Sequence, residues 1–163
     1  MKKLFVIACM ILMSTATFAQ QGKMAIGGNL SLGVYDNYNP IGIGPKFQWE
    51  FINNVRGDVS IDLFTKKNGG GIWDINANIH YLFNVARNIN IYPLGGLTLV
   101  STTGGGDTET MFGFNLGGGG EYYLTKVVKL NAEIKYQYAK KKKSGIDIGV
   151  DGVVFSAGVA YVF

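Results

Sequence analysis

Apolar and polar residues alternate with a period of two along most of the chain after residue 20. In the stretch from residue 41 to 52, isoleucine and aromatic residues occupy every second position, and Lys46, Gln48 and Glu50 lie between them. Side chains of an extended strand point alternately to opposite faces, so the pattern predicts a strand with one apolar and one polar face. Nothing after residue 20 has the spacing of a long amphipathic helix.

Eight stretches of this kind predict an all-β fold of eight antiparallel strands. The predicted strands span residues 23–35, 41–52, 55–63, 73–83, 89–101, 110–124, 128–138 and 146–163. The connections between them alternate in length. Those at residues 36–40, 66–71, 102–109 and 139–145 are longer and richer in Gly, Lys and Asp than the others. Both termini then lie at the end with short turns, an arrangement typical of outer-membrane barrels.

The last predicted strand changes phase partway along. Ile148 and Val150 alternate in one phase, and Val153 and Phe155 alternate in the other. One extra residue in a strand shifts its phase, so we expect a β-bulge near residues 151–152. The chain ends on Phe163 without a charged tail, as expected for a terminal strand that pairs with the first strand and closes a barrel.

The polar face of the strands carries charges of both signs, placed near one another. Glu50 and Arg56 flank one predicted turn, and Glu121 and Lys129 flank another. Such mutual pairing favours a narrow enclosed interior over a solvated surface, so the charged face is expected to line the lumen of a barrel. The predicted lumen network consists of Lys46, Glu50, Arg56, Asp58, Asp62, Asp74, His80, Glu121, Lys129, Glu133 and Lys135.

Two features of this network have a possible chemical role. Asp62 and Asp74 are expected to face each other across the loop at residues 66–71, and two close carboxylates can hold a cation. We expect Lys46 to neutralise them instead. His80 is the only histidine, and its expected neighbours are Arg56 and Asp58. A general base needs a nucleophile and an access route, so a hydrogen-bonded lumen histidine is the favoured interpretation. No metal site and no cofactor are predicted.

Aromatic residues on the apolar face gather toward the two ends of the strands, with small and aliphatic residues between them. Amphipathic rings favour the two interfaces of a bilayer, so this distribution predicts two aromatic belts around a lipid-facing band. The predicted belts contain Trp49, Phe51, Trp73, Tyr81, Phe83, Phe112, Tyr122, Tyr136, Tyr161 and Phe163.

Residues 1–19 have the pattern of a secretory signal peptide. Lys2 and Lys3 precede an apolar segment, and Ala19 provides a cleavage site before Gln20. Removal of this segment takes away Cys9, the single cysteine, and leaves residues 20–163 as one barrel domain. It also removes two positive charges from a chain with a formal net charge of +4, so basicity gives no reason to expect nucleic acid as a partner.

Together, the signal, the alternation, the loop asymmetry and the terminal aromatic residue resemble the small OmpX/OmpA-type family of eight-stranded outer-membrane barrels. The stretch from Val159 to Phe163 resembles the C-terminal signal that the barrel-assembly machinery recognises. The resemblance implies an up-and-down transmembrane barrel, inserted by that machinery into the outer membrane of a Gram-negative cell. Eight strands enclose little more than their own side chains, so the polar interior is expected to be plugged.

The sequence therefore predicts a non-enzymatic, monomeric barrel with a structural or surface-interaction role through its outward loops. Outer-membrane lipid and lipopolysaccharide are the expected partners, the latter because Lys140 to Lys143 make the outer rim basic. Two alternatives stay open at this point. One is a secreted lipocalin-like barrel that binds a small apolar ligand. The other is a lipid A-modifying enzyme, although no His-Ser arrangement of that type is visible.

Overall fold

The computed structural model describes residues 22–35, 39–65, 71–104, 107–143 and 146–163. No helix within these ranges is long and apolar enough to cross a membrane. The strands are β1 (Met24–Tyr35), β2 (Ile41–Ile52), β3 (Val55–Phe64), β4 (Gly71–Tyr81), β5 (Phe83–Ala86), β6 (Ile89–Gly104), β7 (Asp107–Tyr123), β8 (Val128–Lys143) and β9 (Ile146–Val162).

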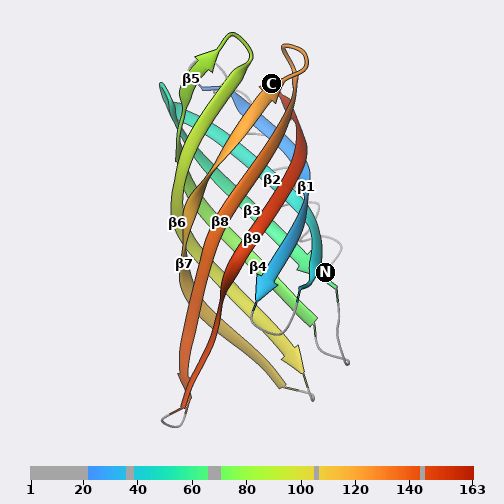
Figure 1. Cartoon of the computed structure of the whole chain (residues 1–163), viewed down its shortest axis with the longest axis vertical. Coiled ribbons are helices and arrows are strands. Elements are labelled where there is room, and N and C mark those ends of the chain that lie inside the picture. The colour runs from blue at the N-terminus through green and yellow to red at the C-terminus, as the bar shows by residue number, and fades with distance from the viewer. Residues whose placement is uncertain (1–21, 36–38, 66–70, 105–106, 144–145) are drawn as a thin grey trace, which may run out of the picture.

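The strands form a closed antiparallel barrel (Figure 1). Strands that follow one another in the sequence pair with each other, except that β4 pairs with β6 and not with β5. β4 and β5 both pair with β6 and are separated by the single residue Leu82, so together they act as one of the eight strands of the barrel wall. The wall closes where β1 pairs with β9, from Ala25 opposite Val162 to Tyr35 opposite Gly152. The predicted eight-stranded up-and-down barrel is confirmed.

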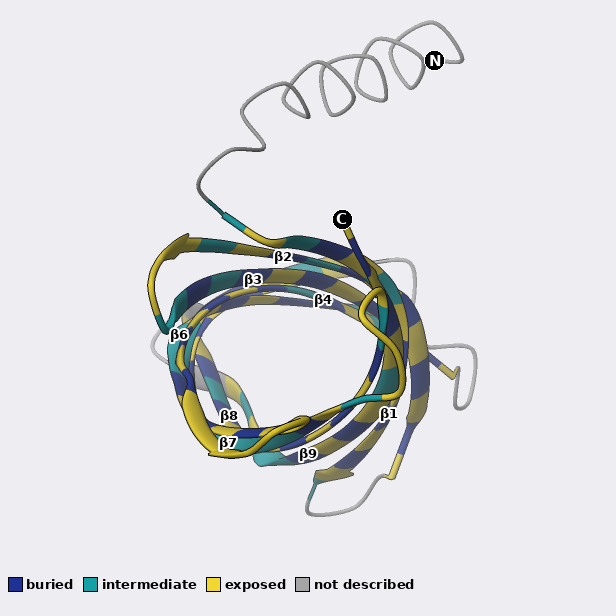
Figure 2. Cartoon of the chain, turned by 90° about the horizontal axis from the view of Figure 1, so that it is seen from above, coloured by how far each residue is buried: buried dark blue, intermediate teal, exposed yellow. Residues whose placement is uncertain are grey.

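The two faces of the wall have the orientation of a membrane barrel. Along β3, Asp58 and Asp62 are buried, whereas Val59 and Leu63 between and beyond them are exposed. Figure 2 shows the same alternation of buried and exposed residues around the whole barrel. The polar interior is therefore confirmed. The lipocalin-like alternative requires the opposite facing and does not fit.

Two hairpins are longer than predicted. Residues 102–109 and 139–145 were expected to be loops, but the ladder of β6 and β7 continues to Gly104 opposite Asp107, and that of β8 and β9 continues to Lys143 opposite Ile146. Backbone pairing needs no apolar side chains, so Thr-rich and Lys-rich segments extend the strands beyond the apolar band. The two hairpins reach farthest at the end of the barrel opposite the C-terminus (Figure 1).

The predicted bulge in the last strand is absent. β9 pairs with β8 in one unbroken register from Ile146 opposite Lys143 to Tyr161 opposite Val128. Val150 therefore has the same facing as Val154 and points inward. The prediction was wrong because it assumed that every apolar residue of this strand faces outward.

The ends of the barrel differ as expected from the connections. The turn between β2 and β3 is tight, and Asn54 adopts a positive φ of 66°, which asparagine tolerates better than most residues. The chain termini of the barrel lie at this end, where Met24 and Phe163 exchange backbone hydrogen bonds of 3.1 and 2.9 Å. Most of the longer connections at residues 36–40 and 66–71 lies outside the described residues.

A charge introduced on the outer face in the middle of the wall should block insertion. Ala77 is exposed and lies opposite Val59 and Leu97 on the adjacent strands. Arginine on the lipid face costs about 2–4 kcal/mol at the bilayer midplane and about 0–1 kcal/mol near its interfaces. We expect Ala77→Arg to reduce the amount of folded protein in isolated outer membranes severalfold, measured by heat-modifiable gel mobility.

The matched control is Thr108→Arg, because Thr108 is exposed near the tip of the β6–β7 hairpin. This variant should accumulate as the unmodified protein does. Equal accumulation of both variants would show that Ala77 does not contact lipid.

Candidate functional site

Polar side chains from all parts of the wall fill the barrel interior. Asn76, His80 and Gln137 are 0% exposed, although they point away from the outer surface. Side chains that line an open water-filled channel would be accessible to solvent, so the lumen is filled at the level of these residues. Of the predicted lumen residues, Lys46, Arg56, Asp58, Asp62, Asp74, His80, Glu121, Lys129, Glu133 and Lys135 are buried. Glu50 is half-buried at the short-turn end.

An ion triad lies at the short-turn end of the lumen. Arg56 Nη1 and Lys129 Nζ lie 2.6 and 2.9 Å from the same carboxylate oxygen of Glu121. The other oxygen of Glu121 accepts a hydrogen bond of 2.9 Å from Asn90 Nδ2. Arg56 thus reaches across the lumen, whereas Glu50 accepts a hydrogen bond from the backbone of the nearby turn. The triad connects β3 across the lumen with the adjacent strands β7 and β8.

A second ion cluster lies next to the triad. Lys46 Nζ is 2.7 Å from Glu133 and 3.7 Å from Asp58, so one ammonium group forms ion pairs with two buried carboxylates. His80 is connected to the triad, because Arg56 Nη2 lies 3.1 Å from its Nδ1. Ion pairs of this kind offset the desolvation of their charges only when each charge has a partner.

The same cluster contains a group of potential metal ligands. One ligand atom each of Asp58, His80 and Glu133 lies within 4.8 Å of the other two. The ammonium group of Lys46 already contacts both carboxylates, however. The arrangement therefore has its own cation, and it favours a structural ion cluster over a metal centre.

Tyr92 joins the ion cluster to His80, although it is not among the predicted lumen residues. Its hydroxyl group donates a hydrogen bond of 2.8 Å to Glu133, and its ring stacks on His80 with centroids 4.6 Å apart. Gly119 faces this ring, because a Cβ atom there would lie 2.8 Å from Tyr92 Cε2. The run of glycines in β7 thus makes room for a lumen aromatic residue.

The two aspartates of the middle layer do face each other. Asp62 lies opposite Asp74 in the pairing of β3 and β4. Asp62 accepts a hydrogen bond of 2.6 Å from Asn29 Nδ2, and Asp74 accepts one of 2.8 Å from Asn76 Nδ2. The prediction that Lys46 neutralises this pair was wrong, because its ammonium group pairs with Glu133 of β8 and Asp58 of β3 instead. Amide and hydroxyl donors surround the two carboxylates.

An apolar layer occupies the lumen toward the long hairpins. Val100, Met111 and Ala139 are buried and in contact, and Ile72 and Val150 pack against them. Val100 has the parity of the inward-facing residues of β6, such as Thr98, although it is apolar. The lumen is thus plugged by a charged section followed by an apolar section.

The outer surface carries the aromatic residues expected for membrane interfaces. Trp49 packs edge-on against Phe51 at the short-turn end, as Tyr81 does against Phe83. All ten residues of the predicted belts are exposed: Trp49, Phe51, Trp73, Tyr81, Phe83, Phe112, Tyr122, Tyr136, Tyr161 and Phe163. Their exposure leaves these rings available to the bilayer.

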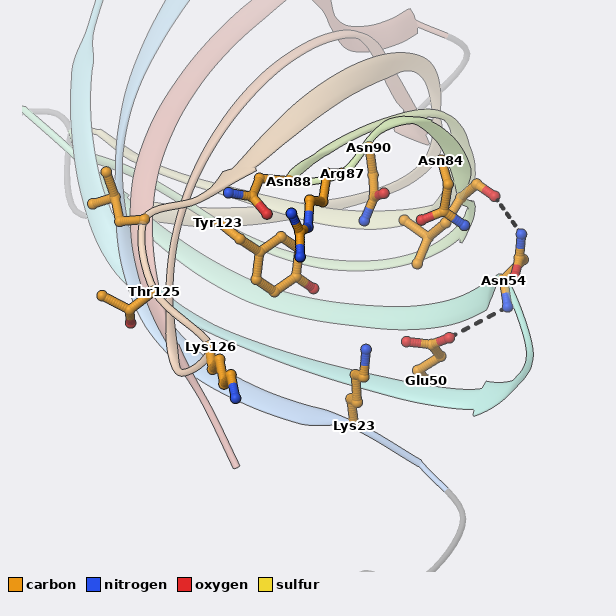
Figure 3. Close-up of a pocket in the computed structure, with 12 residues that line it drawn as sticks. Lys23, Glu50, Asn54, Asn84, Arg87, Asn88, Asn90, Tyr123, Thr125 and Lys126 are labelled. Atoms are coloured by element: carbon orange, nitrogen blue, oxygen red, sulfur yellow. Dashed lines mark hydrogen bonds between the residues drawn. The ribbon is translucent and has the colours of Figure 1, made fainter.

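Each end of the barrel has a polar feature. At the short-turn end, a recess of about 710 Å³ opens beneath the turns (Figure 3). At the other end, Lys140 to Lys143 form the last four residues of β8 in the long hairpin. Lys141 pairs with Glu109 at 3.0 Å, and Lys140 lies over the ring of Tyr138.

A closed barrel with an ionic, filled lumen, an apolar outer face and exposed aromatic residues near both ends defines an integral membrane β-barrel of the bacterial outer-membrane class. The chain belongs to the outer membrane protein beta-barrel domain family, whose model matches residues 5–163. An outer-membrane location follows from this membership.

Solved structures with the same fold have low sequence identity to this chain. Neisserial surface protein A is 21% identical with a TM-score of 0.67, covering 87% of this chain and 97% of its own. The N-terminal barrel domain of Pseudomonas aeruginosa OprF is 18% identical with a TM-score of 0.67, covering 88% and 100%. Ail of Yersinia pestis, in complex with the heparin analogue sucrose octasulfate, is 19% identical with a TM-score of 0.58, covering 88% and 100%. A search of curated proteins gave no match.

Removing the central carboxylate of the ion triad should destabilise the barrel. Glu121→Gln leaves Arg56 and Lys129 buried without their shared counter-charge. Breaking a buried ion pair in this way costs about 3–5 kcal/mol. We expect a loss of this size in the free energy of unfolding, measured by urea titration in phospholipid vesicles with tryptophan fluorescence as the signal.

Glu109→Gln provides a matched control, because the Lys141 side chain that it contacts is 44% exposed and stays hydrated. This exposed pair should contribute less than about 1 kcal/mol. If the two variants lost the same stability, the triad would not hold the lumen together.

Proposed function

We propose that the protein is a non-enzymatic, non-conducting outer-membrane barrel whose β8–β9 hairpin binds anionic groups at the cell surface. The observation that carries the proposal is the row of four lysines on a hairpin that extends beyond the apolar band of the barrel. In this proposal the signal segment is cleaved, the barrel-assembly machinery inserts the chain, and the barrel acts as a monomer.

The lumen supports the non-conducting part of the proposal. A permeating ion would have to displace both the buried ion cluster around Lys46 and the apolar layer around Met111. Val100 and Ala139 in that layer are 0% exposed. An eight-stranded barrel has an interior just wide enough for side chains, and here they fill it.

The burial of His80 supports a non-enzymatic role. Its ring is 0% exposed, lies flat against Tyr92, and has Nδ1 next to Arg56. A lipid A-modifying enzyme would need its base in contact with lipid at the membrane surface. We therefore propose that His80 has a structural role.

The hairpin supports a role in binding anions. Lys140 to Lys143 lie opposite Gly149, Ile148, Asp147 and Ile146 in the strand pairing, so the four lysines are paired with a segment that contains one acidic residue. Lys140 and Lys141 are both exposed, and successive residues of a strand point to opposite faces, so these two lysines lie on opposite sides of the hairpin. Phosphate groups of lipopolysaccharide are the expected binding partners. The similarly folded Ail was solved in complex with the heparin analogue sucrose octasulfate, and this supports the proposal.

Replacing the four lysines should weaken binding to lipopolysaccharide. With Lys140, Lys141, Lys142 and Lys143 all changed to serine, we expect the dissociation constant for purified lipopolysaccharide to rise at least about tenfold, because several charge contacts are lost together. Surface plasmon resonance on the detergent-solubilised protein would measure it. The matched variant with four arginines should keep its affinity. Equal binding by the serine and arginine variants would refute the role of the hairpin.

The filled lumen should also prevent the protein from conducting ions. Purified protein in planar bilayers is expected to show no stable single-channel conductance, because the two plugging sections exclude water and ions. Reproducible openings with a defined conductance would contradict the non-conducting part of the proposal and would leave the hairpin result unaffected.

A further inference from the structure

The recess at the short-turn end is built from side chains that converge on one opening. Lys23 points into it from one wall, and Arg87 and Tyr123 point into it from the opposite wall (Figure 3). Its volume of about 710 Å³ lies within the range of small-molecule sites. The lining is polar and includes Asn54, Asn84, Asn88, Asn90, Thr125 and Lys126.

The recess has an excess of positive charge. Together with the ion triad beneath it, the recess contains five cationic side chains and two carboxylates. The cations are Lys23, Arg56, Arg87, Lys126 and Lys129, and the carboxylates are Glu50 and Glu121. Within the lining of the recess itself, Lys23, Arg87 and Lys126 outnumber the single carboxylate of Glu50. A concave site with one dominant sign of charge concentrates counter-ions.

The floor of the recess has unused hydrogen-bonding capacity. A small void of about 10 Å³, large enough for about one water molecule, lies between Lys23 and Glu50 of the recess and Arg56 of the triad. Arg56 is 3% exposed, and its Nε has no hydrogen-bond partner among the described residues. Gln48 lines the same void, and its Oε1 also has no hydrogen-bond partner among the described residues. Buried polar atoms are normally satisfied, so the free donor and the free acceptor indicate a place for a water molecule beneath the recess.

The geometry points to a binding site, at the short-turn mouth of the barrel, for a small soluble anion that bears carboxylate or phosphate groups together with amide or hydroxyl groups. Lys23, Arg87 and Lys126 bind the charges, and the asparagine side chains hydrogen-bond the neutral polar groups. In the membrane orientation of this class, the mouth faces the periplasm, so the ligand comes from that compartment. The site is separate from the lysine hairpin, which lies at the opposite end.

Isothermal titration with a triglutamate peptide tests the site, with the protein purified from outer membranes in a non-ionic detergent. Triglutamate should bind with one saturable site, and trilysine should not bind. Replacing Lys23, Arg87 and Lys126 by glutamine should weaken triglutamate binding at least about tenfold. The charge-preserving variant Lys23→Arg, Arg87→Lys and Lys126→Arg should retain it. Heat-modifiable mobility establishes that each variant is folded.

Two results of the titration would contradict the proposed site. Absence of saturable triglutamate binding, or equal affinity in the glutamine variant, removes it. A control that changes Lys141 to glutamine at the far end should leave the affinity unchanged, and a comparable loss there would show that overall charge alone is responsible. If triglutamate binds in phosphatidylcholine nanodiscs but not in phosphatidylglycerol nanodiscs, an anionic lipid headgroup occupies the recess, and the assignment to a soluble anion is wrong.

Discussion

The structure depends on one constraint, which is that a backbone polar group in the apolar part of a bilayer has no water with which to pair. The pairing of β1 with β9 removes the two sheet edges that would otherwise present unpaired N–H and C=O groups. Closure of the barrel also determines which residue types each face of the wall can carry. The outward-facing residues contact lipid and are apolar. The inward-facing residues are enclosed, so their charged groups must find partners within the lumen. The triad around Glu121 and the cluster around Lys46 meet this second requirement.

The sequence was sufficient for the fold, because a period of two assigns every residue of a strand to one face. Asp58 and Val59 show this directly, since the pattern alone separated a lumen residue from a lipid-facing one. The same pattern could not supply partners across the lumen. Lys46 contacts Glu133 on β8, and that choice depends on the tilt and stagger of the closed wall, which no local pattern contains. The bulge predicted next to Val150 was wrong because an apolar residue can also face inward, where it packs against other apolar residues of the lumen.

The filled lumen divides the molecule into two separate polar ends. The long hairpins carry Lys140 to Lys143 on one side, and the recess around Lys23 and Arg87 opens on the other. Both ends are cationic, whereas the charged side chains between them are buried in the lumen, where ion pairs and amide donors contact them. Both proposed binding sites therefore lie at the ends, and the barrel wall separates them.

The most direct test of the structure is the facing of consecutive residues along one strand in a lipid bilayer. Nitroxide labels placed singly at Ile75, Asn76, Ala77, Asn78 and Ile79 of β4 would report their accessibility to oxygen, which partitions into lipid. Accessibility should alternate, with high values at Ile75, Ala77 and Ile79 and low values at the two asparagines. High values at the asparagines, or no alternation, would contradict a lipid-facing apolar surface around a polar lumen.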